Sequence, residues 1–160
     1  MIKKQYEKVV TGNVYDLERA NDHTCSLANS GIKAKDMPEE EAKFVKENHA
    51  GCCLHYSMYL IELLHNAGVE CYFTITPEED GTNHCSVLYK GDNGEKYIAD
   101  PVADVKDGTV DRHMCIEYDE FVSKAIRNEI SHYDLFGEHG EEAFFGAKFL
   151  SSCKLESIVI

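Results

Sequence analysis

The chain has 160 residues, of which 43% are hydrophobic and 28% charged, a balance typical of a folded globular protein rather than a disordered one. Its formal net charge of -13 argues against non-specific binding to nucleic acid or to an anionic membrane. The sequence holds no uninterrupted apolar segment of roughly 18 residues, the length of a membrane span, and no apolar run follows the N-terminal lysines, so we expect a cytoplasmic protein without a signal peptide.

The N-terminal third of the sequence predicts helices separated by an irregular connection. Residues 1–22 carry partial helical periodicity, interrupted at Gly12, and residues 23–36 are expected to form the irregular connection. A helix is then predicted to begin around Pro38 and to end near Asn48. Proline suits the first helical turn, and the acidic residues after it stabilise the positive end of the helix dipole.

A largely buried helix is predicted from Cys52 to Ala67, with Gly68 as the residue that ends it. Small and apolar side chains recur at helical spacing over a broad face, which indicates burial. These residues are Cys53, Leu54, Ser57, Met58, Leu60, Ile61 and Leu64.

Strand-like segments follow at residues 69–76, 84–90 and 95–100, which are rich in β-branched and aromatic side chains. The Gly-Asp-Asn-Gly stretch at 91–94 is a strong hairpin signal because asparagine and glycine tolerate positive φ. Pro101 ends the third strand. Three consecutive strands joined by short turns predict an antiparallel meander, against which the preceding helix packs.

The remainder of the sequence carries weaker signals. Residues 102–114 are expected to be irregular, residues 118–130 predict a helix with Asp119 as its N-cap, and the apolar tail from about residue 143 is expected to finish as a strand. Helices followed by antiparallel strands predict an α+β fold. Because no linker-like stretch divides the chain, we predict a single domain over residues 1–160.

The order of a cysteine, a histidine and an aspartate predicts thiol chemistry. A cysteine begins the buried helix, where unpaired amide dipoles favour a thiolate. His84 begins the second strand and Asp100 ends the third, and folding these strands about their turn places residue 84 roughly opposite residue 101. We therefore expect His84 and Asp100 to be neighbours, the histidine to accept a proton and the aspartate to orient it.

The same region, residues 48–102, resembles the transglutaminase-like superfamily. The residues that carry the resemblance are Gly51-Cys52-Cys53-Leu54-His55-Tyr56-Ser57, then Asn66-Ala67-Gly68-Val69, then His84, then Asp100-Pro101. The resemblance implies a transglutaminase/papain-like core, in which the helix that carries the nucleophile packs on a short antiparallel sheet.

The resemblance also implies roles for individual residues. Cys53 would be the nucleophile, His84 the base and Asp100 its orienting partner, in acyl transfer on an amide bond of a peptide or protein through a thioacyl-enzyme. Asn48, by analogy with papain-like enzymes, and the backbone N–H of Cys53 are the donors expected to stabilise the oxyanion. Cys52 is expected to support the site as a packed neighbour that faces away from Cys53.

Two positions depart from the family pattern and leave other functions open. Ser86 stands where the family often has an aromatic residue, and Tyr97 stands near the place of a usual tryptophan, which this chain lacks. These differences concern the substrate groove more than the predicted catalytic residues. A catalytically inactive protein-binding domain on the same fold is the main alternative, and a thiol-based redox sensor is a third interpretation.

Seven cysteines are present, an odd number that cannot all pair, and we interpret them as reduced thiols, with Cys71, Cys85 and Cys115 in the core. The absence of any CxxC motif argues against a disulfide oxidoreductase and a zinc ribbon. Several residues have side chains of the kinds that bind metal ions, namely Cys52, Cys53, His55, His84 and Cys85. Their spacing is unlike that of zinc motifs, so we predict no metal and no cofactor.

The remaining polar residues receive ordinary structural interpretations. We expect His55 to lie on the surface or beside the site, and residues 39–41, three glutamates, to mark only the start of a helix. Asp104 and Asp107 are interpreted as solvated loop residues, because the pattern of a calcium-binding loop is missing. The sequence leaves the oligomeric state open.

Overall fold

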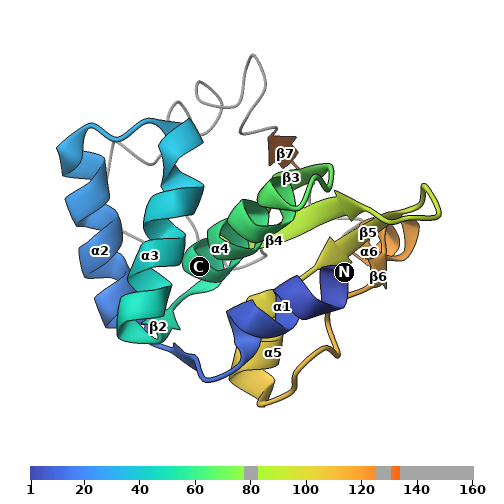
Figure 1. The fold of residues 1–160 in the computed structure, drawn as a ribbon, viewed down its shortest axis with the longest axis horizontal. Coiled ribbons are helices and arrows are strands. Elements are labelled where there is room, and N and C mark those ends of the chain that lie inside the picture. The colour runs from blue at the N-terminus through green and yellow to red at the C-terminus, as the bar shows by residue number, and fades with distance from the viewer. Residues whose placement is uncertain (78–82, 125–130, 134–160) are drawn as a thin grey trace.

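Helices and strands account for most of the residues that this computed structural model describes, which are 1–77, 83–124 and 131–133 (Figure 1). In chain order the elements are α1 (Ile2–Val10), β1 (Val14–Tyr15), α2 (Leu17–Ser30), the 3-10 helix η1 (Ala34–Asp36), α3 (Met37–Asn48), β2 (Ala50–Gly51), α4 (Cys53–Asn66), β3 (Cys71–Pro77), β4 (Asn83–Lys90), β5 (Lys96–Ala99), α5 (Pro101–Asp107), β6 (Ile116–Glu117), α6 (Tyr118–Lys124) and β7 (Ser131–Tyr133). The chain is an α+β protein, as predicted. Residues 125–130 of the last predicted helix and the predicted strand after residue 143 lie outside the described residues.

The main sheet has the strand order β6-β5-β4-β3-β7, and all of its neighbouring strands are antiparallel. Its centre is the predicted meander of β3, β4 and β5. The 91–94 turn closes with a hydrogen bond of 2.8 Å from the Gly91 N–H to the Glu95 carbonyl, and Gly94 adopts a φ of 80°. Val87 pairs with Ala99. Continued along the two chains, this register sets residue 84 opposite residue 102, one residue from the predicted partner, residue 101.

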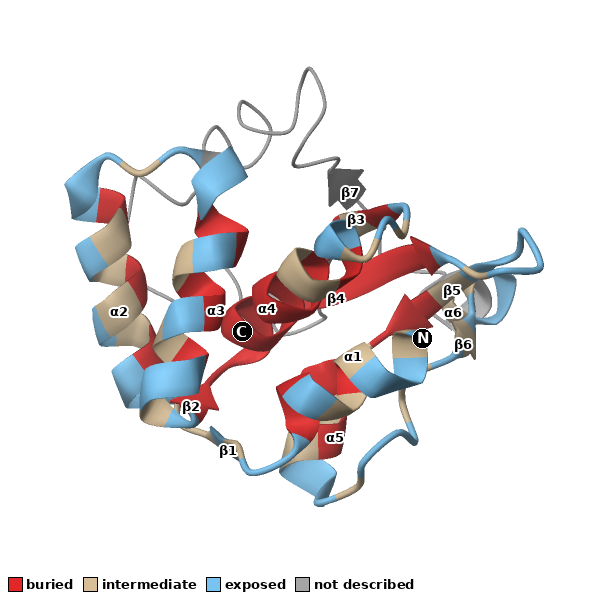
Figure 2. Ribbon diagram, viewed as in Figure 1, coloured by how far each residue is buried: buried red, intermediate tan, exposed pale blue. Residues whose placement is uncertain are grey.

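Helix α4 is buried on almost every side and forms the middle of the molecule (Figure 2). Ten of its 14 residues are buried, and it contacts α1, α3, α5, β3 and β4. Its bounds agree with the prediction to within one residue, and Gly68 takes the expected left-handed conformation with a φ of 77°. Each fully buried leucine, isoleucine or methionine contributes roughly 1.5–3 kcal/mol to folding, so this helix determines where its neighbours pack.

The expected irregular connection at 23–36 is wrong, because α2 continues as far as Ser30. The Asp16 carboxylate begins this helix by accepting a hydrogen bond of 3.0 Å from the Arg19 N–H. Its buried residues, Ala20, Thr24 and Ala28, recur every four positions and are small. Helical periodicity is therefore present, but its apolar signal is too weak to predict a helix from sequence alone.

The expected irregular segment at 102–114 is also wrong, because α5 occupies its first half. Asp100 is the N-cap of α5, Pro101 fills the first helical position, and Gly108 ends the helix with a φ of 69°. The Asp-Pro pair therefore ends one element and begins the next. A smaller correction applies to α6, which begins at Tyr118, so that Asp119 lies in its first turn rather than at its N-cap.

Asp104 is not the solvated loop residue that we expected, because its side chain is fully buried. Its carboxylate accepts hydrogen bonds from the Tyr6 hydroxyl, the Thr109 hydroxyl, the Arg112 and His113 backbone N–H groups at 3.1 and 3.0 Å, and a His113 ring nitrogen at 3.1 Å. Burial raises the pKa of Asp104, but the hydrogen bonds, led by that from Thr109, outweigh it and lower the pKa below its usual value. One carboxylate thus joins α1, α5 and the segment after α5.

We predict that Asp104→Asn destabilises the protein by roughly 1.5–3 kcal/mol, the range for hydrogen bonds to a charged group. The amide places an N–H group where donors already converge. Because the folded-state pKa of Asp104 is depressed, its contribution is present above the unfolded-state pKa and is lost as the pH falls through the folded-state pKa. Urea unfolding should show the largest difference between the two proteins near pH 7 and a smaller one in acid.

Asp107→Asn is the matched control, since Asp107 lies in the same helix with a side chain that is 51% exposed. It should change the unfolding free energy by less than about 0.5 kcal/mol. Equal effects of the two substitutions would contradict the central role of Asp104.

No helix among the described residues is long and apolar enough to cross a membrane.

Candidate functional site

The three residues predicted to act together lie at the ends of three different elements. Cys53 is the first residue of α4, His84 follows the first residue of β4, and Asp100 is the N-cap of α5. His84 Nε2 lies 2.7 Å from Asp100 Oδ2, so the predicted proximity of these two residues is confirmed. The roles proposed for them stay predictions.

Contacts on both its side chain and its backbone fix Asp100. Its other carboxylate oxygen, Oδ1, accepts a hydrogen bond of 3.4 Å from the Ala103 N–H, the capping bond of α5. Its backbone N–H donates to the His113 carbonyl at 2.9 Å, and its carbonyl accepts from the Tyr6 hydroxyl at 3.1 Å. Tyr6 and His113 are themselves partners of Asp104, so the buried Asp104 network positions the carboxylate that meets His84.

The electrostatics of Cys53 and His84 are linked, because His84 lowers the pKa of the Cys53 thiol and Cys53 raises the pKa of the His84 imidazole. Burial lowers the pKa of His84, but the Asp100 carboxylate and then Cys53 raise it above its usual value. The imidazole is therefore stabilised in its protonated form.

The environment of the Cys53 thiol favours its neutral form. Burial is the largest influence and raises the pKa of Cys53; hydrogen bonds with Cys52 and His84 lower it, and one with Cys85 raises it, with a net upward shift. The residue is 1% exposed. As described, the sulfur is thus closed to solvent and surrounded by two further thiols.

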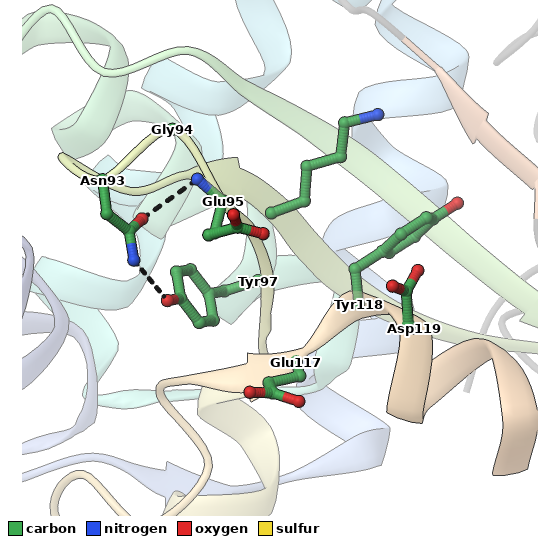
Figure 3. A pocket seen from close by; sticks show the side chains of 8 residues that line it. Asn93, Gly94, Glu95, Tyr97, Glu117, Tyr118 and Asp119 are labelled. Atoms are coloured by element: carbon green, nitrogen blue, oxygen red, sulfur yellow. Dashed lines mark hydrogen bonds between the residues drawn. The ribbon is translucent and has the colours of Figure 1, made fainter.

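A wide cavity lies at the end of the β4–β5 hairpin that is opposite His84. A cavity of about 620 Å³ lies between the 93–95 turn and the β6–α6 segment (Figure 3). Figure 3 shows Asn93 at its rim, donating to the Tyr97 hydroxyl at 2.9 Å and accepting from the Glu95 N–H at 3.0 Å. His84 is at the opposite end of β4, so the cavity does not border Cys53.

Cys52 lies outside helix α4, so it is not the helical neighbour of Cys53 that we expected. It is the N-cap of α4 and has extended backbone angles, so the 100° step between neighbours in a helix does not apply to it. Its Sγ lies 3.4 Å from His55 Nδ1. Cys115 is a further correction, since it is exposed and not in the core, whereas Cys71 and Cys85 are buried as predicted.

Asn48, the predicted oxyanion donor, makes a local contact. Its side-chain amide donates to the Phe44 carbonyl at 2.9 Å, one turn earlier in α3. This bond occupies one of the two N–H groups of the amide, and a role for the other stays a prediction.

Sequence reasoning missed a second group of polar residues beside the first. Of the two places expected for His55, the surface is wrong, because the residue is fully buried and lies beside Cys52. Glu41 is also fully buried and is more than the start of a helix. The Glu41 Oε2 lies 2.9 Å from His55 Nε2 and 3.5 Å from His23 Nδ1. The signal was present, because Glu41 is four residues from both Met37 and Val45, which form the buried face of α3.

No family model, no curated protein and no solved structure matches the chain.

Gly51, which precedes the two cysteines, gives a prediction about this site. A Cβ atom at Gly51 would lie 2.7 Å from His55 Cβ, which is too close for two carbon atoms. The β2 backbone can therefore pack this closely against the first turn of α4 only with glycine at position 51. We predict that Gly51→Ala destabilises the protein by roughly 1–3 kcal/mol through overpacking. An unchanged urea unfolding midpoint at an unchanged m-value would show that the turn relaxes instead.

Proposed function

We propose that this protein is a cysteine-dependent enzyme of the transglutaminase-like type, which transfers an acyl group from an amide bond of a peptide or protein through Cys53. The observation that carries the proposal is the hydrogen bond of 2.7 Å between His84 and Asp100. Cys53, at the start of a buried helix, acts on the same imidazole and raises its pKa. Nucleophile, base and orienting carboxylate come from three elements, in the order that the sequence pattern requires.

In the reactive form, the proton shared by Cys53 and His84 lies on the imidazole, and the sulfur attacks the carbonyl carbon as a thiolate. The Asp100 carboxylate favours this form, because it raises the pKa of His84. The imidazolium then gives its proton to the departing amine, the C–N bond breaks and a thioester remains on Cys53. Water or an amine takes the acyl group, and the thiol is restored.

The N-terminus of α4 offers donors for the negatively charged oxygen of the intermediate. Cys52 makes no side-chain capping hydrogen bond within the described part of the chain, and the first turn of a helix has N–H groups without helical partners. The Cys53 N–H is the donor closest to the reacting sulfur, and such a donor contributes about 2.7–4 kcal/mol to lowering the barrier.

A catalytically inactive protein-binding domain on the same scaffold is the second function that a specific observation favours. Cys53 is 1% exposed, and its pKa is raised by burial. Both features suit a small core residue better than a nucleophile. The two functions differ in whether His84 controls the reactivity of Cys53, which can be measured without knowing the substrate.

We predict that iodoacetamide alkylates Cys53 faster than the equally buried Cys85, because the imidazolium stabilises the thiolate of Cys53. Peptide mass spectrometry after short exposures at pH 7 measures the rate at each cysteine separately. His84→Ala and Asp100→Asn should both slow the alkylation of Cys53 and leave the exposed Cys115 unchanged.

His65→Ala, which alters an exposed histidine near the end of α4, serves as the control for loss of an imidazole. Cys53 and Cys85 reacting at the same slow rate in the parent chain and in His84→Ala would exclude the enzyme and leave the binding domain.

Acyl donors provide a second prediction. Incubation with activated esters and peptide amides should leave an acyl mass on Cys53, and this adduct should persist in Cys52→Ala and disappear in Cys53→Ala. Because base catalysis typically contributes 10²- to 10⁴-fold, His84→Ala should slow adduct formation by about that factor. An adduct that moves to Cys52 or is independent of His84 would contradict the assignment of Cys53.

A further inference from the structure

Three polar side chains from three helices meet in the interior on the other side of α4. His23 comes from α2, Glu41 from α3 and His55 from α4; α2 and α3 run side by side in Figure 1, and α4 packs against α3. His23 Nδ1 lies 3.1 Å from His55 Nε2, and Glu41 Oε2 lies 2.9 Å from His55 Nε2 and 3.5 Å from His23 Nδ1. The side chains of Glu41 and His55 are fully buried, and that of His23 is 18% exposed.

The Glu41 carboxylate lacks the hydrogen bonds that a buried charge requires. Neither of its oxygens has a hydrogen-bond partner within the described part of the chain, and the contact of His55 Nε2 with Oε2 at 2.9 Å is an ion pair. Buried carboxylates are normally paired and hydrogen-bonded, or else they coordinate a metal. Between His23 and His55, only one proton fits on the line that joins the two ring nitrogens.

We infer that His23 Nδ1, Glu41 Oε2 and His55 Nε2 form a binding site for a divalent transition-metal ion of the zinc class. Zinc is bound by imidazole nitrogen and carboxylate oxygen at about 2.0–2.2 Å in tetrahedral geometry, which places neighbouring ligand atoms roughly 3.3–3.5 Å apart. The three distances of 2.9, 3.1 and 3.5 Å between the atoms of this site are close to that spacing. They form one face of a tetrahedron, whose fourth position remains for water or another ligand.

The surroundings of the two histidines also suit a metal site. Histidines that bind metal usually have a partner on the second ring nitrogen, which fixes the orientation of the ring. The second nitrogen of His55, Nδ1, lies 3.4 Å from Cys52 Sγ. The His23 ring stacks on Phe44, with centroids 3.9 Å apart and planes 16° apart, so its orientation is also fixed.

The charge at this position favours a cation. Two neutral imidazoles and one carboxylate leave a buried negative charge, which is costly without a counter-charge.

Packing gives the ion a structural role. Helix α2 buries only Ala20, Thr24 and Ala28, so it contributes little apolar area. A metal ion held by one residue from each of α2, α3 and α4 would join these helices, and its binding free energy would add to folding stability. The site is separate from the thiol site, since Cys53 and His55 are about 200° apart around α4.

Zinc titration of the full chain tests the inference. After treatment with a chelator, the protein should bind one zinc ion per chain in competition with a chromophoric chelator, and its melting temperature should rise with zinc concentration. Loss of a hydrogen-bond partner of a metal ligand weakens metal binding by roughly 10- to 100-fold. Because Glu41→Gln and His23→Gln each remove a ligand itself, each should weaken zinc binding by more than that. Glu39→Gln, an exposed glutamate on the same helix, should leave it unchanged.

Circular dichroism of each variant with chelator present checks that it folds, and His23→Gln is the milder change because His23 is partly exposed. Cys53→Ala should bind zinc like the parent chain, so loss of the thiol site and loss of the metal site are distinguishable. Failure of the parent chain to bind zinc, or equal binding by parent, Glu41→Gln and His23→Gln, overturns the inference.

Cobalt identifies the ligands directly. Co²⁺ in the parent chain should give the visible d–d absorption of a tetrahedral site without a thiolate-to-cobalt charge-transfer band, because its ligands are nitrogen and oxygen. A charge-transfer band that disappears in Cys52→Ala would place sulfur on the metal and overturn this ligand set.

Discussion

The burial of α4 on almost every side is the constraint on which the rest of the structure depends. Because the helix is surrounded, its first turn presents side chains to two different neighbours. Cys53 meets His84 of the sheet, and His55, about 200° further around the helix, meets Glu41 of α3 and His23 of α2. Both candidate sites therefore arise from one turn, and Gly51 allows the chain to enter that turn closely enough for either to form.

The hydrogen bonds of buried Asp104 fix the histidine side of the thiol site. Asp104 binds Tyr6 and His113, these two residues bind the backbone of Asp100, and the carboxylate of Asp100 binds His84. Each contact in this series is polar and largely removed from water, where a missing partner costs about 1–3 kcal/mol. The position of the imidazole is thus determined by residues that never touch it.

The doubled cysteine has a physical explanation in this arrangement. Cys52 lies outside the helix as its N-cap and Cys53 lies inside as its first residue, so the two thiols belong to different backbone conformations. Each thiol is linked to a histidine that meets a carboxylate. Cys52 Sγ lies 3.4 Å from His55, which meets Glu41, and the pKa of Cys53 is lowered by His84, which meets Asp100. The adjacent thiols therefore face the two separate polar clusters of the protein.

The sequence alone determined the elements whose signals are local. Apolar periodicity located α4, alternating and β-branched segments located the meander, and the 91–94 turn set a register accurate to one residue, which brought His84 to Asp100. Only the tertiary structure decided the rest. Asp104 and Glu41 resemble ordinary solvated acids in sequence, because their partners come from other elements: Tyr6 is 98 residues from Asp104, and His55 of α4 meets Glu41 of α3. Burial of a charge depends on such distant partners, and no local pattern encodes them.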